Sequence, residues 1–194
     1  PAIILADGVI GQMMEKVVLP EQRTRLTDEE VIARCPWATT GRTHHRTPNI
    51  ITSLELDPAE MEKRNIHLQK KYAEIEENEV RFEELHCEDA EYLIVAFGSC
   101  ARIAQKAMEM AREEGIKVGL LRPITLWPFP SKAIAARAAQ VKGILTVELN
   151  AGQMVEDVRL AVECKVPVEH FGRLGGIVPD PDEVITALKE KLIK

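Results

Sequence analysis

The sequence predicts an α/β fold over residues 91–194, in which a mostly parallel sheet is flanked by helices. Short apolar runs that fit buried strands alternate there with longer stretches that fit helices. The connections between them are short, and repeated strand–helix units with short connections form parallel sheets whose faces are covered by helices. About 100 residues suffice for such a domain to fold alone.

The predicted elements of this domain follow one another regularly along the chain. A helix of residues 101–114 is ended by Gly115, Ser131 caps the next helix, which runs to about residue 140, and a third covers residues 153–163. A capped terminal helix lies within residues 179–193. The predicted strands are YLIVAFG (92–98), KVGLLRPI (117–124), ILTVELN (144–150) and VPVEHFGR (166–173).

One further strand and helix are predicted at the beginning of the chain. Residues 2–6 form a short apolar run that Asp7 and Gly8 stop, and Asp7 is a plausible N-cap for a helix over residues 8–18. This strand has no sheet to join. The chain also opens without Met and inside an apolar run, so we expect that residue 1 is not the start of the natural polypeptide.

The region between these parts is predicted to be a linker that contains one long helix. Residues 19–53 show no period of 2 or 3.6, and loops of this length are usually functional or linkers. Asp57 as N-cap and Pro58 at the first helical position begin a helix that we expect to run over residues 57–85. Met61, Leu68, Ile75 and Phe82 form a single apolar stripe, which favours a connecting helix over a coiled coil.

Composition and charge exclude several classes of function. The net charge of −6 argues against nucleic acid as the main partner, because phosphate binding requires clustered Lys and Arg. The apolar runs are too short to cross a bilayer. Residues 74–91 form an acidic block that we interpret as a solvated helix face and linker.

The four cysteines, Cys35, Cys87, Cys100 and Cys164, have no metal-ligand spacing, and we expect reduced thiols in the cytoplasm.

Ligands of parallel sheets bind beyond the carboxyl ends of the strands, so the residues there are candidates. Gly98 permits a tight turn and Ser99 could cap the following helix, leaving N–H groups that could hold an anion, but one glycine is a weak signal. Glu148 and Asn150, near Gly152, could take part in general acid–base catalysis. Because no nucleophile, second carboxylate or metal group accompanies them, we favour a hydrogen-bonded structural pair or an interface pair.

Two other groups of residues are weighed in the same way. Gly175 and Gly176 precede the terminal helix and fit a chain reversal better than a binding loop. His44 and His45 suggest a metal site, but adjacent histidines point different ways and no third ligand is suitably spaced, so ordinary loop residues are the default. The residues therefore predict no catalytic set.

The stretch PITLWPFPS concentrates aromatic residues in a chain that is poor in them. Pro128 and Pro130 stiffen a turn that holds Trp127 and Phe129 beyond the sheet, and Ser131 follows as the predicted cap. We interpret this turn as a rigid aromatic ledge. It either packs on the core of its own domain or is buried against a partner.

Five blocks of sequence, in this order, resemble the alpha-type subunits of the 2-oxoacid:ferredoxin oxidoreductases. They are ADGVIGQMMEKVVLPE, KKYAEIEENEVRFEE, AEYLIVAFGS, GIKVGLLRPITLWPFP and VELNAGQMVEDVR. The block over the long helix most resembles the branched-chain enzymes, which use 2-oxoisovalerate (3-methyl-2-oxobutanoate). The likeness covers nearly the whole chain.

The resemblance implies three parts. Residues 1–20 would be the C-terminal remnant of a thiamine diphosphate pyrimidine-binding domain, residues 21–90 a linker with the long helix 57–85, and residues 91–194 a domain similar to the transketolase C-terminal domain. The family often has a glycine-rich stretch in the linker, where this chain has TTGRTHHRTPN. If this loop approaches an active site, Thr40, Gly41 and His44 are the residues of interest.

The activity that the resemblance implies is oxidative decarboxylation of a 2-oxoacid to an acyl-CoA and CO₂, with electrons passed to ferredoxin. Thiamine diphosphate, Mg²⁺, [4Fe–4S] clusters and coenzyme A would serve the whole complex, and other subunits would be the partners. The family's cofactor-binding positions match no position in this chain. We therefore assign no catalytic, cofactor-binding or metal residue here and expect the chain to be inactive alone. Alternatives are an assembly module of such a complex, a relative specific for 2-oxoglutarate or pyruvate, or a free-standing anion binder.

Overall fold

A five-stranded sheet forms the centre of the C-terminal part of the chain, in a computed structural model that describes residues 2–6, 8–14, 16–37 and 50–193. The strand order is β1–β3–β2–β4–β5, and β1 is antiparallel to β3 while the other neighbours are parallel. The bounds are β1 Phe82–Leu85, β2 Tyr92–Ala96, β3 Val118–Pro123, β4 Gly143–Glu148 and β5 Val168–Gly172. The predicted α/β fold with a mostly parallel sheet is confirmed.

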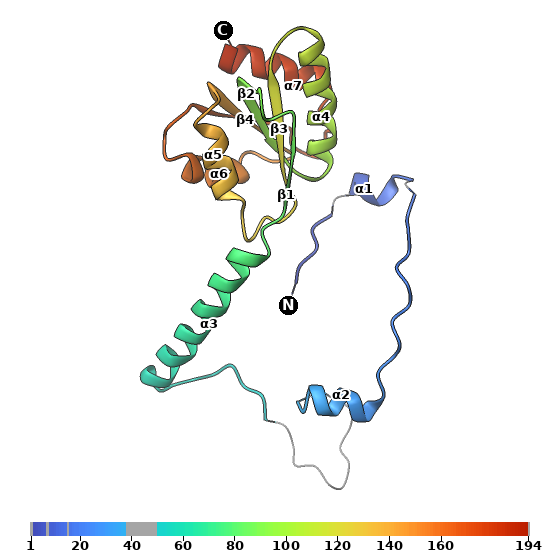
Figure 1. Cartoon of the computed structure of the whole chain (residues 1–194), viewed down its shortest axis with the longest axis vertical. Coiled ribbons are helices and arrows are strands. Elements are labelled where there is room, and N and C mark those ends of the chain that lie inside the picture. Colours follow the sequence, from blue (N-terminus) through green and yellow to red (C-terminus); the bar gives the residue numbers. More distant parts are fainter. Residues whose placement is uncertain (1, 7, 15, 38–49, 194) are drawn as a thin grey trace. The chain divides into compact units, whose positions relative to one another are not determined.

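Helices cover both faces of this sheet (Figure 1). The bounds are α4 Gly98–Glu113, α5 Ser131–Ala138, α6 Met154–Val162 and α7 Pro181–Leu188, which continues as a π-helical turn over Lys189–Ile193. α4 and α7 pack on one face with Ile94 and Leu145 of the central strands, and α5 and α6 pack on the other with Leu93 and Ile144. Each central strand is therefore buried on both sides, as parallel strands generally are.

The starts of the helices differ from the predicted ones in two places. Phe97 is the N-cap of α4 and Pro130 that of α5, and neither makes a side-chain cap hydrogen bond. The prediction that Ser99 and Ser131 cap these helices is therefore wrong, because both residues already lie within the first turn. The terminal helix is capped as expected: the side chain of Asp180 accepts from the N–H of Asp182, and Glu183 completes a capping box.

The predicted helix over residues 57–85 is too long. α3 spans Pro58–Asn78 and begins as expected, since Asp57 Oδ1 accepts from the N–H groups of Ala59 and Glu60. Residues 82–85 form β1 instead, with Phe82 opposite Pro123 and Leu85 opposite Leu120. Pairing with β3 and packing of Leu85 against the core are available only to the strand, so tertiary contact overrides the local pattern.

The N-terminal part of the chain is less regular than predicted. No strand lies over residues 2–6, and the helix expected over residues 8–18 is only α1, Gly8–Gln12. A short helix, α2 Asp28–Arg34, lies in the stretch that was expected to be irregular. Its signal was present in the sequence, because Thr27 and Glu30 form a capping box.

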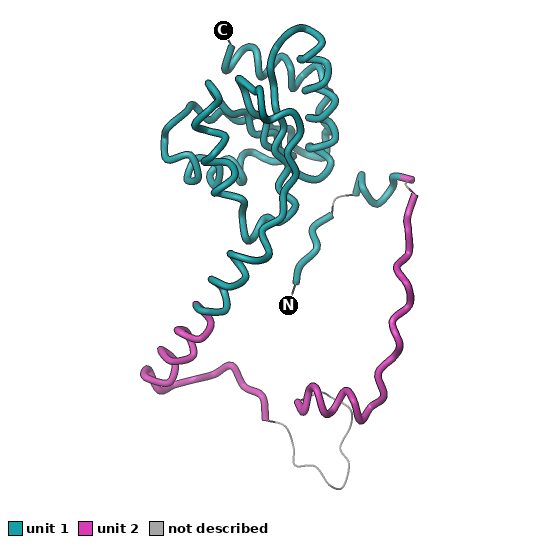
Figure 2. The backbone as a smooth tube through the Cα atoms, in the orientation of Figure 1, with its two compact units in different colours: residues 1–13, 70–194 teal, residues 14–69 magenta. Residues whose placement is uncertain are grey.

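The backbone separates into two compact units, one of residues 1–13 and 70–194 and the other of residues 14–69 (Figure 2). Within the described residues no helix is long and apolar enough to cross a bilayer. The first unit holds the sheet and is the one that positions the candidate site.

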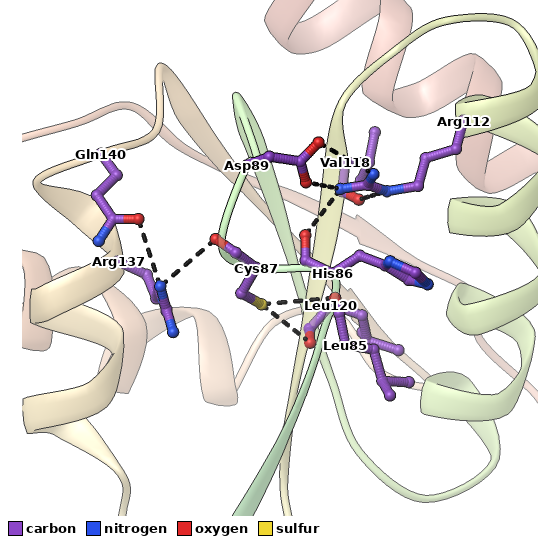
Figure 3. A network of polar contacts seen from close by, with 9 residues as sticks. All are labelled: Leu85, His86, Cys87, Asp89, Arg112, Val118, Leu120, Arg137 and Gln140. Atoms are coloured by element: carbon purple, nitrogen blue, oxygen red, sulfur yellow. Dashed lines mark hydrogen bonds and ion pairs between the residues drawn. The ribbon is translucent and has the colours of Figure 1, made fainter.

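Two arginines, one from each face of the sheet, contact the turn after β1 (Figure 3), and one of them also binds β1 itself. Arg137 of α5 donates to both carboxylate oxygens of Glu84 in β1, at 2.8 and 2.6 Å. Arg112 of α4 donates to the Asp89 carboxylate at 2.6 Å and to the His86 carbonyl at 2.8 Å. Paired, forked guanidinium contacts of this kind are among the stronger polar interactions in proteins. Arg137 thus attaches β1 to α5, and Arg112 attaches the turn after β1 to α4.

A buried thiol lies between the two arginine contacts. Cys87 Sγ donates to the carbonyl groups of Leu120 and Leu85, at 3.4 and 3.6 Å (Figure 3). Burial, followed by the negative charge of Glu84, raises the pKa of Cys87 to about 11. The thiol is therefore protonated and unreactive at neutral pH, and its role is packing.

Replacing Glu84 tests the contribution of the Arg137 contact. The hydrogen bonds from Arg137 lower the pKa of Glu84, so this carboxylate stabilises the fold above its unfolded pKa, and that stability is lost as pH falls through the folded pKa. We expect Glu84→Gln to lower the free energy of unfolding by about 1–2 kcal/mol at pH 7. In urea titrations at decreasing pH, the difference from wild type should disappear in acid.

Glu83→Gln is the matched control for this measurement. Glu83 also pairs with an arginine, Arg122, at 2.9 Å, but both side chains are about half exposed. Exposed pairs of this kind contribute little, so the control should change the free energy of unfolding by less than about 0.5 kcal/mol. Equal effects of the two substitutions would show that the Glu84–Arg137 contact has no special role.

Candidate functional site

The topology of the sheet creates a crevice between β2 and β4. The chain leaves β2 through α4 toward β3 on one side, and it leaves β4 through α6 toward β5 on the other. α4 and α6 cover opposite faces of the sheet. The carboxyl ends of two neighbouring strands whose connections diverge in this way are the usual binding place in open α/β sheets.

A cavity of about 200 Å³ lies at this point. Three stretches of chain line it. Two follow the strands, residues 97–100 after β2 and residues 147–150 at the end of β4, and the third comes from the beginning of the chain through Leu5, Ala6 and Ile10. Most of these side chains are apolar. The predicted candidates Gly98, Ser99, Glu148 and Asn150 are thus brought together at one crevice.

The turn at the start of α4 uses the glycine that the sequence suggested. Gly98 has φ +57°, a left-handed conformation that L side chains rarely adopt. Ser99 follows as a buried residue inside the first turn of the helix and does not act as its N-cap. Gly98 therefore turns the backbone sharply from β2 into α4, directly beside the crevice.

Glu148 is the most completely enclosed charged residue of the site. Its side chain is buried, and its two oxygens accept from the backbone N–H groups of Gln153, Met154 and Val155, at 3.2, 2.8 and 3.0 Å. These are the first N–H groups of α6, which lack partners within the helix. A carboxylate is also favoured at the positive end of the helix dipole. Glu148 thus caps α6 from the end of β4 and is not free for acid–base work.

Asn150 shapes the loop that follows. Its Oδ1 accepts from the N–H of Gly152 at 2.7 Å, which closes a tight turn two residues long. Gly152 has φ +111°, a value that favours glycine strongly. The Glu148 and Asn150 side chains therefore both make hydrogen bonds within the domain, as expected for residues that hold the β4–α6 connection.

His170 is a member of this site that sequence reasoning missed. Its Nδ1 lies 3.3 Å from Glu148 Oε1 and 3.2 Å from Thr146 Oγ1. The Thr146 hydroxyl also contacts the Glu169 carbonyl at 3.3 Å, so the acceptors around Nδ1 favour the tautomer that carries its proton there. The signal for this contact was not local, because Thr146 and His170 are opposite each other only through the parallel β4–β5 register.

His170 and Thr146 do not form a nucleophile pair that a substrate could reach. Thr146 is completely buried in the sheet, and Glu148 is committed to α6. His170 Nε2 is buried without a hydrogen-bond partner among the described residues. The group therefore holds the ends of β4 and β5 together with the start of α6, through contacts made within the domain.

The two aromatic residues of the ledge differ in their surroundings. Phe129 packs against the core cluster on the α5 and α6 side, whereas Trp127 is 54% exposed. The ring of Trp127 makes an edge contact with Tyr72 of α3, with ring centroids 5.7 Å apart. Trp127 is therefore supported by one aromatic neighbour but leaves much of its surface uncovered.

The remaining candidates lie either in a turn or outside the described residues. Gly175 and Gly176 have φ of +65° and +84° in the chain reversal before α7, as the turn interpretation requires. Thr40, Gly41, His44 and His45 lie outside the described residues. Among the residues that are described, no three His, Cys, Asp or Glu side chains are grouped so that they could hold a metal ion.

Comparisons with known proteins agree with this architecture. Residues 90–184 match the family model of pyruvate:ferredoxin oxidoreductase core domain II. A 2-oxoglutarate:ferredoxin oxidoreductase from Magnetococcus marinus, solved with 2-oxoglutarate, coenzyme A and succinyl-CoA, aligns with a TM-score of 0.61 at 25% identity, over 70% of this chain and 24% of that one. A split-gene transketolase, an inactive β4 tetramer, shares the fold with a TM-score of 0.51 at 21% identity, over 58% of this chain and 41% of that one. The chain thus shares its fold with these proteins, and residues 90–184 have the sequence pattern of a core domain of the pyruvate:ferredoxin oxidoreductases.

The particular relationship comes from the whole chain. The ketoisovalerate oxidoreductase subunit VorB of Methanothermobacter marburgensis is 43% identical over 190 residues, which cover 98% of this chain and 52% of that subunit. The chain is a homologue of 2-oxoacid:ferredoxin oxidoreductase subunits, and the resemblance of the five sequence blocks is confirmed. It spans about half the length of the curated relatives it matches first.

Gly172 offers a test of how tightly this end of the sheet is packed. A Cβ there would lie 2.2 Å from the Asn150 carbonyl oxygen and 2.6 Å from His170 Nε2. We expect Gly172→Ala to displace the loop after β4 and to lower the free energy of unfolding by roughly 3 kcal/mol, as severe overpacking does. Thermal unfolding followed by circular dichroism would measure the loss.

Gly11→Ala is the control for this substitution. A Cβ on Gly11 of α1 would meet no atom within 4 Å, and alanine is the better helix former. The unfolding temperature should stay constant or rise slightly. A Gly172→Ala variant as stable as the control would contradict the close packing described for this site.

Proposed function

We propose that this chain is part of the alpha-type subunit of a 2-oxoacid:ferredoxin oxidoreductase that acts on branched-chain substrates, above all 2-oxoisovalerate. The observation that carries the proposal is the 43% identity to a ketoisovalerate oxidoreductase subunit along 98% of the chain. The identity to the solved 2-oxoglutarate enzyme is 25% over 70% of the chain. The comparison thus supports the branched-chain substrate over 2-oxoglutarate.

In the complete complex, thiamine diphosphate would supply the chemistry of decarboxylation, and iron–sulfur clusters and coenzyme A would accept electrons and the acyl group. The described residues of this chain do not fit the diphosphate and its Mg²⁺. Glu148, the buried carboxylate of the crevice, is already held by three backbone N–H groups. We therefore derive no step through these groups and infer that other parts of the complex hold them.

The contribution of this half of the subunit is then structural. Under the domain assignment that the resemblance implies, residues 1–20 end a pyrimidine-binding domain, residues 21–90 connect it, and residues 91–194 form the transketolase-like domain. Because β1 at residues 82–85 belongs to the sheet, we move the start of that domain to residue 82. Other subunits of the complex are the proposed partners.

The assay that tests this function uses the complete subunit co-purified with its partner subunits. We expect 2-oxoisovalerate, with coenzyme A, to reduce a low-potential acceptor such as methyl viologen with a kcat/KM at least tenfold above those for 2-oxoglutarate and pyruvate. A factor of ten corresponds to about 1.4 kcal/mol of difference in transition-state stabilisation. A preference for 2-oxoglutarate or pyruvate would overturn the substrate assignment.

The chain by itself provides a complementary test. Isothermal titration calorimetry of the 194-residue chain with thiamine diphosphate and Mg²⁺ should show no binding, because no residue here is assigned to either. Micromolar affinity would contradict the inference that the cofactor groups lie elsewhere. The same titration separates a cofactor-binding module from an assembly module.

A specific observation favours assembly as the role of the aromatic ledge: Trp127 is half exposed, and so is its neighbour Ile124. Large aromatic side chains that are uncovered in a free subunit are common anchors of interfaces. We expect Trp127→Ala to weaken association with the partner subunits at least tenfold, measured by analytical ultracentrifugation. Trp127→Phe, which keeps an aromatic ring, should retain most of the affinity. Normal assembly with lower turnover in Trp127→Ala would instead assign the ledge a direct part in catalysis.

A further inference from the structure

We propose that the half-exposed side chains around Trp127 and the acidic end of α3 form one protein interface, whose partner presents an apolar centre and a basic rim. The apolar patch is defined as Tyr72, Phe82, Ile124 and Trp127. The inference rests on the assembly role proposed above for Trp127 and adds the chemistry of the partner surface. The negative charge that selects a basic partner is that of Glu76, which is exposed.

The apolar patch is contiguous and lies within one compact unit, which contains residues 70–194. Tyr72 of α3 makes the edge contact with Trp127, with ring centroids 5.7 Å apart. Ile124 lies three residues before Trp127, and Phe82 of β1 pairs with Pro123 directly beside it. In sequence order the four side chains of the patch are 39%, 39%, 49% and 54% exposed. Large apolar side chains that are exposed together mark surfaces that contact other proteins.

Backbone hydrogen bonds hold the two segments of the patch together. The Arg81 carbonyl accepts from the N–H groups of Ile124 and Thr125, at 2.9 and 3.1 Å. The N–H of Arg81 donates to Thr125 Oγ1 at 3.0 Å, and that hydroxyl donates to the Pro128 carbonyl at 2.8 Å. The patch is therefore formed before any partner binds, and a preformed surface loses less conformational entropy on binding.

Glu76 carries a negative charge that its own helix does not stabilise. It lies two residues before the end of α3, where the negative end of the helix dipole disfavours a carboxylate, and the last turn contains no basic residue. Glu79 pairs with Arg81 at 3.3 Å, so its charge is already compensated. Glu76 makes no ion pair within the part of the chain that the structure describes. The residues one helical turn away from it include no cation: Tyr72, Ala73, Glu79 and Val80.

The spacing along α3 places this charge beside the apolar patch. Successive residues of an α-helix are about 100° apart, so Glu76 lies only about 40° from Tyr72 around the helix axis. The two nearest lysines, Lys71 and Lys70, lie about 100° and 160° from Tyr72. The rim of the patch on this side is therefore negative. Because charges across an interface are generally complementary, the partner surface that fits it has an apolar centre and a cation at its rim.

The first experiment asks what covers Trp127, with the complete subunit alone and in complex with its partner subunits. Hydroxyl-radical footprinting, read at Trp127 by mass spectrometry, measures how accessible this side chain is. We expect oxidation in the subunit alone and an oxidation rate at least fivefold lower in the complex. Equal oxidation in both would overturn the interface. Protection already in the subunit alone would show that its own chain covers the patch, and would overturn the partner as occupant.

The second experiment tests the charge of the partner by reversing that of Glu76. Association with the partner subunits is measured by analytical ultracentrifugation at about 0.1 M salt, where charges interact over roughly 10 Å. We expect Glu76→Lys to weaken association at least tenfold, because a lysine would face the basic rim of the partner. The fold should persist, since a cation near the end of a helix is favoured by the dipole. Unchanged or stronger association would overturn the basic rim.

Glu77→Lys is the matched control for this charge reversal. It changes the same charge one residue further along α3, but at a position about 140° from Tyr72 around the helix. Association should weaken less than threefold. If Glu76→Lys and Glu77→Lys weaken association equally, the effect belongs to the net charge of the helix, and the interface proposed for this side of α3 is wrong.

These results are separable from the test of the proposed function. The substrate preference in the viologen assay is measured on the wild-type complex, whichever surfaces hold its subunits together. A complex that prefers 2-oxoisovalerate but leaves Trp127 accessible would overturn only this interface. A complex that protects Trp127 but prefers another 2-oxoacid would overturn only the substrate assignment.

Discussion

The buried carboxylate of Glu148 is the interaction on which the candidate site depends. It stands at the end of the central strand β4 and accepts from three backbone N–H groups of α6, and its Oε1 faces His170 of the neighbouring strand. A buried charge is tolerated only when hydrogen bonds replace the lost water, and the helix N-terminus supplies them. This contact fixes where α6 begins and therefore forms one wall of the crevice. It also explains why a glutamate at the expected place for catalysis is not available for it.

At the edge of the sheet, hydrogen bonds from charged side chains again hold a segment of backbone, but here the charges are positive. Arg112 and Arg137, from helices on opposite faces, reach the strand and turn that enter the domain. β1 is a four-residue edge strand with two adjacent glutamates, and its own strand propensity is low. These contacts therefore help to hold it in the sheet. Buried apolar packing forms the centre of this domain, and a few well-placed charged side chains attach its periphery.

Under the proposed function, the structure and the comparisons together concern only part of a longer subunit. A homologue of 2-oxoacid:ferredoxin oxidoreductase subunits that spans about half the length of its relatives presents a crevice at the place where α/β sheets bind ligands. The polar groups there are engaged within the domain, and the remaining surface is apolar. At Trp127, which is 54% exposed, the uncovered aromatic surface favours contact with another protein.

The sequence by itself determined the alternation of strands and helices, the cap at Asp57, a capped terminal helix, and the family, because apolar periodicity, capping residues and blocks of similarity are local properties. It placed Gly98, Glu148 and Asn150 at strand ends for the same reason. Only the tertiary structure decided that residues 82–85 leave the helical pattern to pair with β3, that Glu148 caps α6, and that His170 joins it. These outcomes depend on strand order and register, which bring together residues far apart in the chain, and no local pattern specifies them.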